Sequence, residues 1–350
     1  MSHSYQSVGW NRQKKIYDLT LAAALVIFFA AWIAFHLVAK PQITAESLLI
    51  RGLAVAALLL LHVILSIGPL CRLDRRFLPL LYNRRHLGVT MFLLAAGHGV
   101  FSLIQFHALG DVNPLLSMLA GNDDFTSASQ FPFQPFGFFA LLILFVMAAT
   151  SHDFWLANLT APVWKALHMG VYLAYLLVIA HVAFGILQSE TDAALAVVVF
   201  LGMVWVLGLH VFAGLHEVAH DRASATQDNR ATWIDAGPAH SIPQGRARIV
   251  QVAGERVAVF RYDDKLSAVS SVCQHQNGPL GEGCVIDGLI TCPWHGYQYD
   301  PQTGASPPPF EERVPTFNLR VEGGQVLIDP RPNPPGTHVQ PVVLEAASDA

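Results

Sequence analysis

Residues 291–300 read TCPWHGYQYD, which places the thiol of Cys292 and the imidazole of His295 within one short turn. A matching stretch lies upstream: residues 270–280 read SSVCQHQNGPL and carry Cys273 and His275. The whole pattern is Cys-x-His, sixteen residues, Cys-x-x-His. Thiolates and imidazoles are the side chains that bind transition metals and iron–sulfur clusters. The sequence therefore predicts one centre with four protein ligands.

Two kinds of centre use two cysteines and two histidines. A Rieske [2Fe–2S] cluster places two thiolates on one iron and two imidazoles on the other, and a structural zinc site uses the same four groups. Zinc fingers usually keep the two cysteines together and the two histidines together, whereas here each stretch contributes one of each. The segments CPWHGYQYDPQTG and CQHQNGPL closely resemble the two loops of the Rieske family. That resemblance implies that Cys273 and Cys292 bind one iron and that His275 and His295 bind the other.

The sequence also departs from the high-potential members of that family. Those members carry an extra cysteine in each loop, whereas Asn277 and Trp294 stand at these positions here, so no disulfide is expected. Cys284, between the loops, is interpreted as a small packed residue. Tyr299 matches the tyrosine of those members, but Tyr297 stands where they have a serine. Because hydrogen bonds to the sulfurs raise the reduction potential, a middling to low potential is expected.

The region around the two loops is rich in short strands. ARIVQVAGERVAVFRYDDKLSAVSSV alternates in a period of two and is broken by Gly254 and by Asp263–Asp264, a pattern typical of antiparallel hairpins. Asp287–Gly288 suits another two-residue turn. We predict an all-β Rieske domain of antiparallel sheets over residues 231–330. A linker at 221–230 precedes it, and a disordered, Pro-rich tail at 331–350 follows it.

The rest of the chain is strongly apolar. Of 350 residues, 53% are hydrophobic and only 13% are charged, with a mean hydropathy of +0.42. A soluble domain has about 25% charged residues, so membrane spans are expected. Residues 1–220 are predicted to form a helical membrane bundle of six transmembrane helices. The apolar runs lie near residues 19–39, 48–70, 88–109, 134–151, 166–187 and 193–216.

Charged residues in the loops predict the orientation. Under the positive-inside rule, basic loops stay in the cytoplasm, which places the N-terminus and the Rieske domain there. We expect a multi-pass protein of the plasma membrane, which is the inner membrane of a bacterium, with lipid as its surroundings. The net charge of −4 gives no reason to expect nucleic-acid binding. The basic residues are Arg12, Lys14, Lys15, Arg72, Arg75, Arg76, Arg84 and Arg85, and the opposite loops carry Asp111, Asp123, Asp124, Glu190 and Asp192.

Histidines are unusually frequent in the predicted spans, and each is costly in lipid. Spans one to six contain His36, His62, His98, His107, His168, His181 and His210, and His86 borders span three. The segments RRHLGVTMFLLAAGH and WKALHMGVYLAYLLVIAH resemble the ferric-reductase-like transmembrane domain, a family that includes the haem membrane subunit of periplasmic methionine sulfoxide reductase. The resemblance implies one or two haem b groups. It implies His98, His168 and His181 as ligands. His86 has no counterpart in the family and is a further candidate from its position alone.

Two features complicate this interpretation. His181 follows His168 by thirteen positions, so the two side chains point about 140° apart on an ideal helix. Either they serve different haems or partners, or a local bulge realigns them. Residues 216–220, HEVAH, match the H-E-x-x-H zinc pattern but lie where the last span leaves the membrane. A solvated helix end, with Glu217 and His220 exposed, is the preferred interpretation.

Together these patterns predict transmembrane electron transfer. A cytoplasmic reductase would reduce the Rieske cluster, haem would carry the electron across, and an acceptor at the outer or periplasmic face would take it. The outer loop, residues 110–133, is long, acidic and apolar, which suits docking a partner or acceptor. The chain has no G-x-G-x-x-G fingerprint, so a flavin is not evident in it. Two alternatives stay open: an electron-donating component of a Rieske-type oxygenase system, and a redox sensor.

Overall fold

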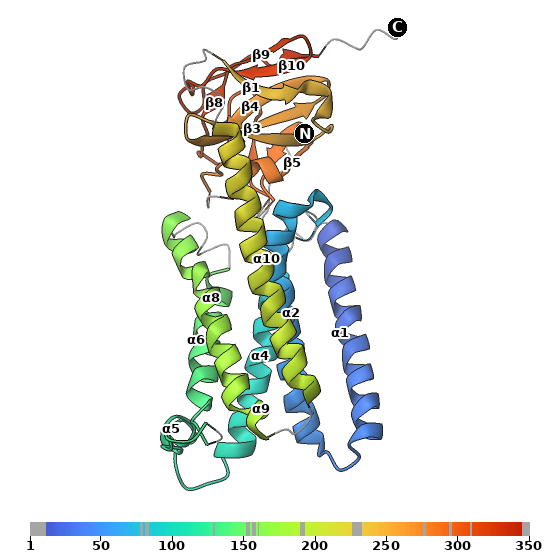
Figure 1. Ribbon diagram of the computed structural model, residues 1–350, viewed down its shortest axis with the longest axis vertical. Helices are drawn as coiled ribbons and strands as arrows, with labels where there is room; N and C mark the ends of the chain where they lie inside the picture. The colour runs from blue at the N-terminus through green and yellow to red at the C-terminus, as the bar shows by residue number, and fades with distance from the viewer. Residues whose placement is uncertain are drawn as a thin grey trace. The chain divides into compact units, whose positions relative to one another are not determined.

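The structure is a computed structural model of the chain. It describes residues 12–77, 80, 84–128, 130–151, 155, 159, 161–189, 193–225, 233–275, 278–293, 296–308 and 310–344. These residues divide into two compact units (Figure 1). Residues 10–67 and 83–210 form a helical unit, whereas residues 1–9, 68–82 and 211–350 form a unit that contains the described β-strands.

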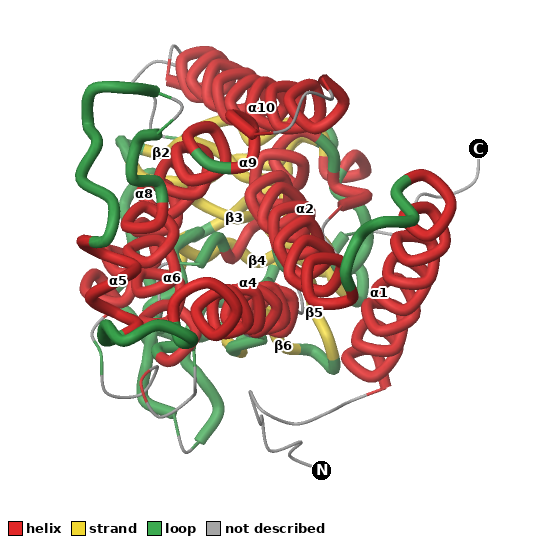
Figure 2. Tube along the Cα trace, turned by 90° about the horizontal axis from the view of Figure 1, so that it is seen from below, coloured by secondary structure: helices red, strands yellow, loops and turns green. Residues whose placement is uncertain are grey.

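The helical unit is an up-and-down bundle, seen along its helices in Figure 2. Five helices are long and apolar enough to cross a membrane, as predicted. The sixth predicted span is a shorter helix of 16 residues, α6, which at 1.5 Å per residue is about 24 Å long. The long helices are α1 (Arg12–Ala39), α2 (Ala45–Leu73), α4 (Arg84–His107), α8 (Ala161–Phe184) and α10 (Ala193–Ala225); the shorter ones are α5 (Pro114–Ala120), α6 (Gln134–Ala149) and α9 (Ile186–Ser189).

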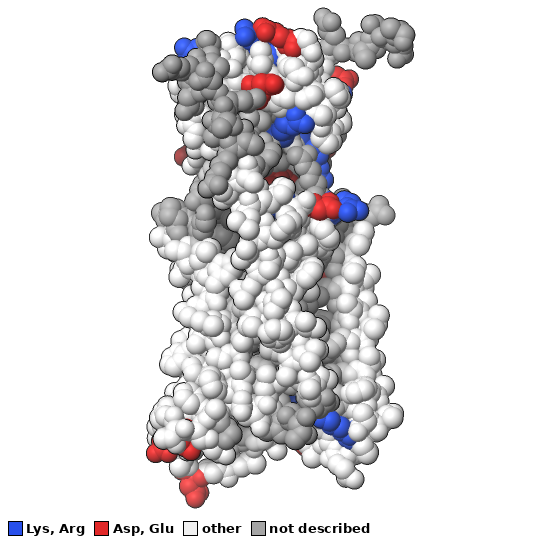
Figure 3. Space-filling model, in the orientation of Figure 1, with Lys and Arg blue, Asp and Glu red and all other residues white. Residues whose placement is uncertain are grey.

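The bundle has a small buried core and an apolar exterior. On the face drawn in Figure 3, charged atoms are confined to the ends of the helices. Many large apolar side chains along the helices are exposed, for example Val38 of α1 at 85% and Phe200 of α10 at 59%. An apolar exterior of this kind needs lipid rather than water around it. The core is formed by Leu61, Leu65, Met91, Leu144, Ala174, Tyr175 and Val206.

The β unit contains three antiparallel sheets. The first has the order β1 (Ile234–Pro238), β10 (Gln325–Ile328), β9 (Leu319–Glu322). The second has the order β11 (Val342–Val343), β4 (Lys265–Ser270), β3 (Glu255–Tyr262), β2 (Arg246–Val252), and β8 (Thr316–Phe317) also pairs with β4. The third has the order β5 (Cys284–Ile286), β6 (Leu289–Thr291), β7 (Gln298–Tyr299). Short 3₁₀ turns lie at η1 (Arg75–Phe77), η2 (Ala239–Ser241) and η3 (Leu280–Glu282).

The predicted hairpins are confirmed by their turns. Asp287 and Gly288, with φ of 52° and 80°, join β5 to β6. Asp263 and Asp264, with φ of 44° and 55°, join β3 to β4. Positive φ at both central residues defines the turn whose twist matches that of antiparallel strands. Aspartate and glycine tolerate this conformation better than other residues, which is why the sequence signals these turns.

Strand β3 separates two apolar cores, because successive side chains in a strand point to opposite faces. Val257 and Val259 contribute to the core against the first sheet. Ala258 and Phe260 contribute to a second core that includes both cysteines of the predicted cluster. All four β3 residues are fully buried. The cluster loops are therefore anchored on the same central strand that holds the domain together.

Two predicted boundaries are wrong. Helix α10 continues to Ala225, so the first half of the predicted linker 221–230 is helical, and residues 226–232 lie outside the described residues. The segment after residue 330 is not a disordered tail as far as Leu344. There, β11 pairs with β4 through Val342 and Leu266, and the amide of Val339 donates to the carbonyl of Gln302 at 2.8 Å. Backbone pairing of this kind is available to a Pro-rich segment at the edge of a sheet.

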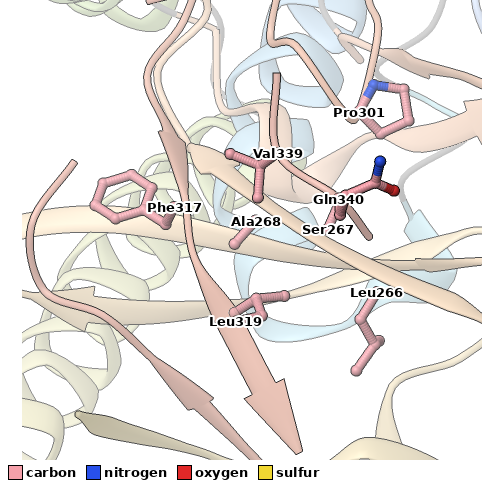
Figure 4. Close-up of a pocket in the computed structure, with 8 residues that line it drawn as sticks. All are labelled: Leu266, Ser267, Ala268, Pro301, Phe317, Leu319, Val339 and Gln340. Atoms are coloured by element: carbon pink, nitrogen blue, oxygen red, sulfur yellow. The ribbon is translucent and has the colours of Figure 1, made fainter. Parts of the chain in front are cut away.

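A shallow surface depression with no enclosed volume lies between this returning segment and strands β4, β8 and β9 (Figure 4). It contains no titratable side chain and no thiol, so it offers no chemistry of its own. Its lining residues are Leu266, Ser267, Ala268, Pro301, Phe317, Leu319, Val339 and Gln340.

Candidate cluster and haem sites

The two cysteine-containing loops close in the same way. The amide of Cys273 donates to the carbonyl of Gly278, and the amide of Cys292 donates to the carbonyl of Tyr297, each at 2.8 Å. In both loops the cysteine thus bonds to the residue five positions later. The second loop also bonds Gly296 to Cys292 at 2.8 Å, and Gly296 has a φ of 71° that favours glycine. Each loop begins at its cysteine and is closed by a backbone hydrogen bond to the residue five positions later.

Both cysteines are buried and neither is in a disulfide. Cys273 and Cys292 are each 1% exposed and lie in the second apolar core. The hydroxyl of Tyr299 lies 3.3 Å from the sulfur of Cys273 and accepts the amide of Gln274 at 3.0 Å. The tyrosine therefore has its own proton left to donate to the sulfur. A thiolate that receives a hydrogen bond is the expected state of a cluster ligand.

On the histidine side of the site, the structure describes His275; His295 and Trp294 lie outside the described residues. The ring of His275 stacks on Tyr297, with centroids 4.5 Å apart and planes 8° apart. Among the described residues, no group of three His, Cys, Asp or Glu side chains surrounds a single point. A Rieske cluster does not need such a group, because each iron takes two protein ligands. The chemistry and burial of the donor set fit a [2Fe–2S] cluster.

Burial governs the acidity of the neighbouring groups. It raises the pKa of Tyr297 and of Tyr299 well above the usual range, and the hydrogen bond to Glu312 adds to the rise at Tyr297. Both tyrosines are therefore protonated and act as hydrogen-bond donors at neutral pH. Burial also raises the pKa of Cys284, which lies half-buried in β5. A thiol of this kind is a weak nucleophile, as expected of a packed residue.

In the helical unit, the structure brings together two of the predicted haem ligands. The rings of His98 on α4 and His181 on α8 have centroids 6.2 Å apart and planes at 75°. The Nδ1 atom of His98 donates to the carbonyl of Ile50, and that of His181 donates to the carbonyl of Phe133, each at 3.1 Å. A carbonyl oxygen can only accept, so both rings carry their proton on Nδ1. The lone pair of each Nε2 atom is then available to a metal.

This arrangement fits a haem iron shared by the two rings. Metal–imidazole bonds of about 2 Å, with roughly 1 Å more from nitrogen to ring centre, separate two such centroids by about 6 Å. The observed separation of 6.2 Å agrees. The ring of His181 also requires Gly137 on α6, since a Cβ there would lie 2.7 Å from its Nδ1 atom. A haem site with one histidine from each of two facing helices is typical of membrane cytochromes in helix bundles.

His168 and His86, the other predicted haem residues, have different surroundings. His168 stacks on Trp164 with centroids 3.8 Å apart, and its Nε2 atom lies 3.4 Å from the hydroxyl of Thr150. The Nδ1 atom of His86 lies 2.9 Å from both carboxylate oxygens of Asp18 on α1. His168 and His181 thus face different neighbours, as their spacing predicted.

Two further histidines have both ring nitrogens occupied. His62 donates from Nδ1 to the carbonyl of Leu58 at 2.8 Å, and the hydroxyl of Tyr175 donates to its Nε2 atom at 3.1 Å. His210 makes the same pair of bonds, with the carbonyl of Val206 at 2.8 Å and the hydroxyl of Tyr172 at 3.2 Å. These bonds satisfy the buried polar groups, and they distinguish His62 and His210 from His98 and His181.

The HEVAH segment lies on α10 within the β unit. The sequence predicted a solvated Glu217, but its carboxylate is paired. Arg256 donates to it, and Arg72 lies 3.5 Å from it. A carboxylate engaged by two guanidinium groups is a structural ion pair rather than a general base. No metal-binding group of three is present here among the described residues. The side chain of His220 lies outside them.

Comparison with known protein families supports the interpretation of both halves of the chain. The family described as Rieske [2Fe-2S] domain matches residues 232–318, and the family described as Ferric reductase like transmembrane component matches residues 51–179. The β unit, with its two cysteine loops, is thus an iron–sulfur electron carrier joined to a multi-pass membrane domain. The chain belongs to the Rieske [2Fe–2S] family, and its membrane domain is of the ferric-reductase-like type.

Relatives of the Rieske part are small electron carriers. The chain is 34% identical over 106 residues to the anthranilate 1,2-dioxygenase ferredoxin subunit of Burkholderia cepacia, covering 30% of this chain and 97% of that protein. It is 31% identical over 98 residues to the ferredoxin component of the naphthalene 1,2-dioxygenase system of Pseudomonas aeruginosa, covering 28% of this chain and 94% of that protein. Among solved structures, the ferredoxin of carbazole 1,9a-dioxygenase from Nocardioides aromaticivorans IC177 is 27% identical over 29% of this chain and all of that one, with a TM-score of 0.28.

Proposed function

We propose that this protein carries electrons across a membrane, from a cytoplasmic donor through its Rieske cluster and membrane haem b to an acceptor at the outer face. The observation that carries the proposal is the pairing of His98 with His181, two imidazoles 6.2 Å apart with their Nδ1 protons bonded to carbonyls. The same chain holds the buried Cys273 and Cys292 of the cluster. Both centres exchange single electrons, so one can reduce the other.

We propose Cys273, Cys292, His275 and His295 as cluster ligands, and His98 and His181 as ligands of one haem. His86 and His168 remain candidates for a second haem. The chain's own residues fix the two haem ligands from four helices: α4 and α8 carry the rings, and Ile50 of α2 and Phe133 at the start of α6 accept their protons. When bound, haem supplies reversible one-electron chemistry.

The direction of transfer rests on the distribution of charge. The first turn of α1 carries Arg12, Lys14 and Lys15, and the segment that connects α2 to α4 carries Arg75 and Arg76, whereas residues 87–164 contain no Lys or Arg. Lys40 and Arg51 are the basic residues near the opposite end of α1 and α2. The balance supports a cytoplasmic N-terminus and Rieske domain under the positive-inside rule. Electrons from a cytoplasmic reductase would then leave at the end of the helical unit that carries α5.

Contacts at this outer end support it as the site of exit. Phe133 lies 5.3 Å from His181, measured between ring centroids. Nearby, Phe131 lies 4.9 Å from Phe184 and 5.7 Å from Phe125, whose side chain is 66% exposed. Close-packed side chains therefore lead from a proposed haem ligand towards the surface. Acidic side chains lie on one side of the same end and Lys and Arg on the other (Figure 3), and the acidic side favours contact with a basic surface of an acceptor.

Vesicles of known orientation test the proposal. In right-side-out vesicles, an internal reductant should reduce an impermeant external acceptor. His181→Ala should slow this step while reduction of the cluster persists, because the cluster precedes the haem. His210→Ala is the matched control, since both nitrogens of that ring are already bonded within the protein. Reduction of the cluster by an external impermeant donor, with none by an internal one, would invert the topology or the direction.

A second candidate function is favoured by the named relatives, which are ferredoxins of dioxygenase systems. In that case the Rieske domain would pass electrons to a cytoplasmic oxygenase, and the membrane domain would supply them. The two candidates differ in the order of reduction. If His181→Ala slows reduction of the cluster instead of reduction of the external acceptor, electrons flow inward and the oxygenase role gains support.

A further inference from the structure

Tyr297 lies between the cluster and a carboxylate. One face of its ring stacks on His275, with centroids 4.5 Å apart and planes 8° apart. Its hydroxyl donates to the Oε2 atom of Glu312. Phe310 packs edge-on against the same ring at 5.1 Å. The tyrosine is 2% exposed, so three neighbours hold its ring in one position.

The carboxylate of Glu312 is itself fixed by the backbone. The amide of Glu311 donates to the Oε2 atom of Glu312 at 3.2 Å, and the backbone carbonyl of Glu312 accepts the amide of Ser306 at 2.9 Å. The bridge between Ala305 and Arg313 closes this loop next to it. The carboxylate cannot turn towards water without breaking its bonds to the Tyr297 hydroxyl and the Glu311 amide. Its negative charge stays at the end of the Tyr297 hydroxyl.

We propose that Tyr297 and Glu312 are positioning residues for the histidine side of the cluster: the tyrosine fixes the plane of the His275 ring, and the glutamate lowers the reduction potential. This inference rests on the proposed assignment of His275 as a cluster ligand. A negative charge close to a redox centre stabilises the oxidised form, which carries more positive charge, and so lowers the potential. The stacked ring holds the imidazole plane, on which the iron–nitrogen interaction depends.

The sulfur side of the cluster is tuned in the opposite direction. Tyr299 lies 3.3 Å from the sulfur of Cys273, and a hydrogen bond to sulfur raises the potential. Two tyrosines two residues apart, at the start of one strand, thus act on different ligands with opposite sign. Both rings lie in the second apolar core with centroids 5.4 Å apart, Tyr297 against His275 and Tyr299 against the sulfur of Cys273. Nothing about a carboxylate beyond Tyr297 is visible in the spacing of the two loops.

The test compares Glu312→Gln with Glu311→Gln in the full-length protein in detergent. Both substitutions remove one negative charge, and the two positions are adjacent, but Glu311 is exposed and its side chain is not placed against Tyr297. An EPR-monitored redox titration should give an upward shift of the cluster potential for Glu312→Gln and no comparable shift for Glu311→Gln. Tyr297→Phe, which keeps the ring and leaves the charge of Glu312 in place, should shift the potential less than Glu312→Gln does.

Two further measurements separate positioning from a merely structural role. Glu312→Gln should raise the potential in the Tyr297→Phe background as well, because the effect is assigned to the charge of Glu312 and not to the hydroxyl. Tyr297→Leu, which removes the stacked ring, should change the histidine nitrogen couplings seen by pulsed EPR, whereas Tyr297→Phe should preserve them. Equal shifts for Glu311→Gln and Glu312→Gln, no shift for Glu312→Gln, or loss of the cluster in both Glu312→Gln and Tyr297→Phe would overturn the inference. Absence of a Rieske signal in the unaltered protein would instead overturn the cluster assignment.

Discussion

His98 and His181 lie on different helices, α4 and α8, yet their imidazole rings are 6.2 Å apart and each donates its Nδ1 proton to a backbone carbonyl. One carbonyl belongs to Ile50 of α2 and the other to Phe133 at the start of α6. Four helices therefore determine the tautomer and the orientation of this pair. The two bonds hold both half-buried rings with the proton on Nδ1, which leaves both Nε2 atoms able to bind a metal.

Replacing either ring should remove this haem. We expect His98→Ala or His181→Ala to lose nearly all of the haem held by the pair, because an iron with one protein ligand is bound weakly and the other ring is left buried and unpaired. Cluster content should stay unchanged, since the cysteine loops fold in the β unit. The measurement is the haem-to-protein and iron-to-protein ratio after purification. Haem ratios equal to the unaltered protein in both variants would show that this pair is not the ligand set.

The close approach of Gly137 to His181 gives a subtler test. A Cβ at this position would lie 2.7 Å from Nδ1 and 2.8 Å from Cε1 of the ring, so Gly137→Ala should displace the imidazole and lower haem content. Gly88→Ala is the matched control, because a Cβ there meets nothing within 4 Å. In a helix the control should be slightly stabilising, by up to about 1 kcal/mol. If Gly137→Ala binds haem as well as Gly88→Ala does, the ring is not held as described.

Sequence reasoning predicted the elements whose signals are local. The hairpin turns at Asp263–Asp264 and Asp287–Gly288 were predicted because few residues adopt positive φ. Long apolar runs predicted six spans; five of them are helices long enough to cross a membrane, and the sixth, α6, is a shorter helix that ends at Ala149. The course of the chain after Pro330 was not predictable in this way. Its pairing with β4 depends on an open strand edge contributed by residues some 70 positions earlier, which no local pattern reveals.

The same distinction applies to the sites. Histidines in an apolar helix indicate polar chemistry, but the sequence cannot show that His62 is satisfied by Tyr175 whereas His98 faces His181. Glu312 was missed for the same reason, since its partner lies fifteen residues away in another loop. Asp18 does carry a sequence signal: an acidic residue at the start of an apolar span is costly, and it is best explained by a partner such as His86.

The cluster and the haem should be separable by mutation. Cys292→Ser should abolish the Rieske EPR signal and leave the haem spectrum intact, because it removes a ligand of the cluster alone; His295→Ala should do the same. Cys284→Ser is the control, since Cys284 lies half-buried in β5, outside both cysteine loops. Tetrahedral zinc in place of iron in the purified, unaltered protein would refute the Rieske assignment.

The Asp329–Arg331 pair predicts how stability depends on pH. Hydrogen bonds from Arg331 lower the pKa of Asp329 below its usual value, and the two bonds are 2.9 and 3.0 Å long. A carboxyl whose pKa is lower in the folded state stabilises the fold above its unfolded pKa of about 3.9, and this contribution is lost as the pH falls through the folded value. Asp329→Asn should therefore lower the melting temperature at neutral pH but not at the acid end. An equal loss at both ends would point to packing instead of charge.

Tyr299→Phe tests the sulfur side of the cluster directly. The substitution removes only the hydroxyl, which lies 3.3 Å from the sulfur of Cys273 and accepts the amide of Gln274. A hydrogen bond to sulfur stabilises the reduced cluster, whose thiolates carry more negative charge, so its loss should lower the potential. One hydrogen bond contributes about 0.5–1.5 kcal/mol, which for a single electron corresponds to a shift of roughly 20–65 mV.

The control for this variant is Tyr262→Phe. Tyr262 is another buried tyrosine of the same core, and its hydroxyl bonds that of Ser267 at 2.8 Å instead of a sulfur. Tyr262→Phe should cost stability of similar size without moving the potential. An EPR-monitored redox titration of the full-length protein measures both variants. A potential that is unchanged in Tyr299→Phe, or lowered equally in Tyr262→Phe, would mean that the hydroxyl of Tyr299 does not act on the cluster through Cys273.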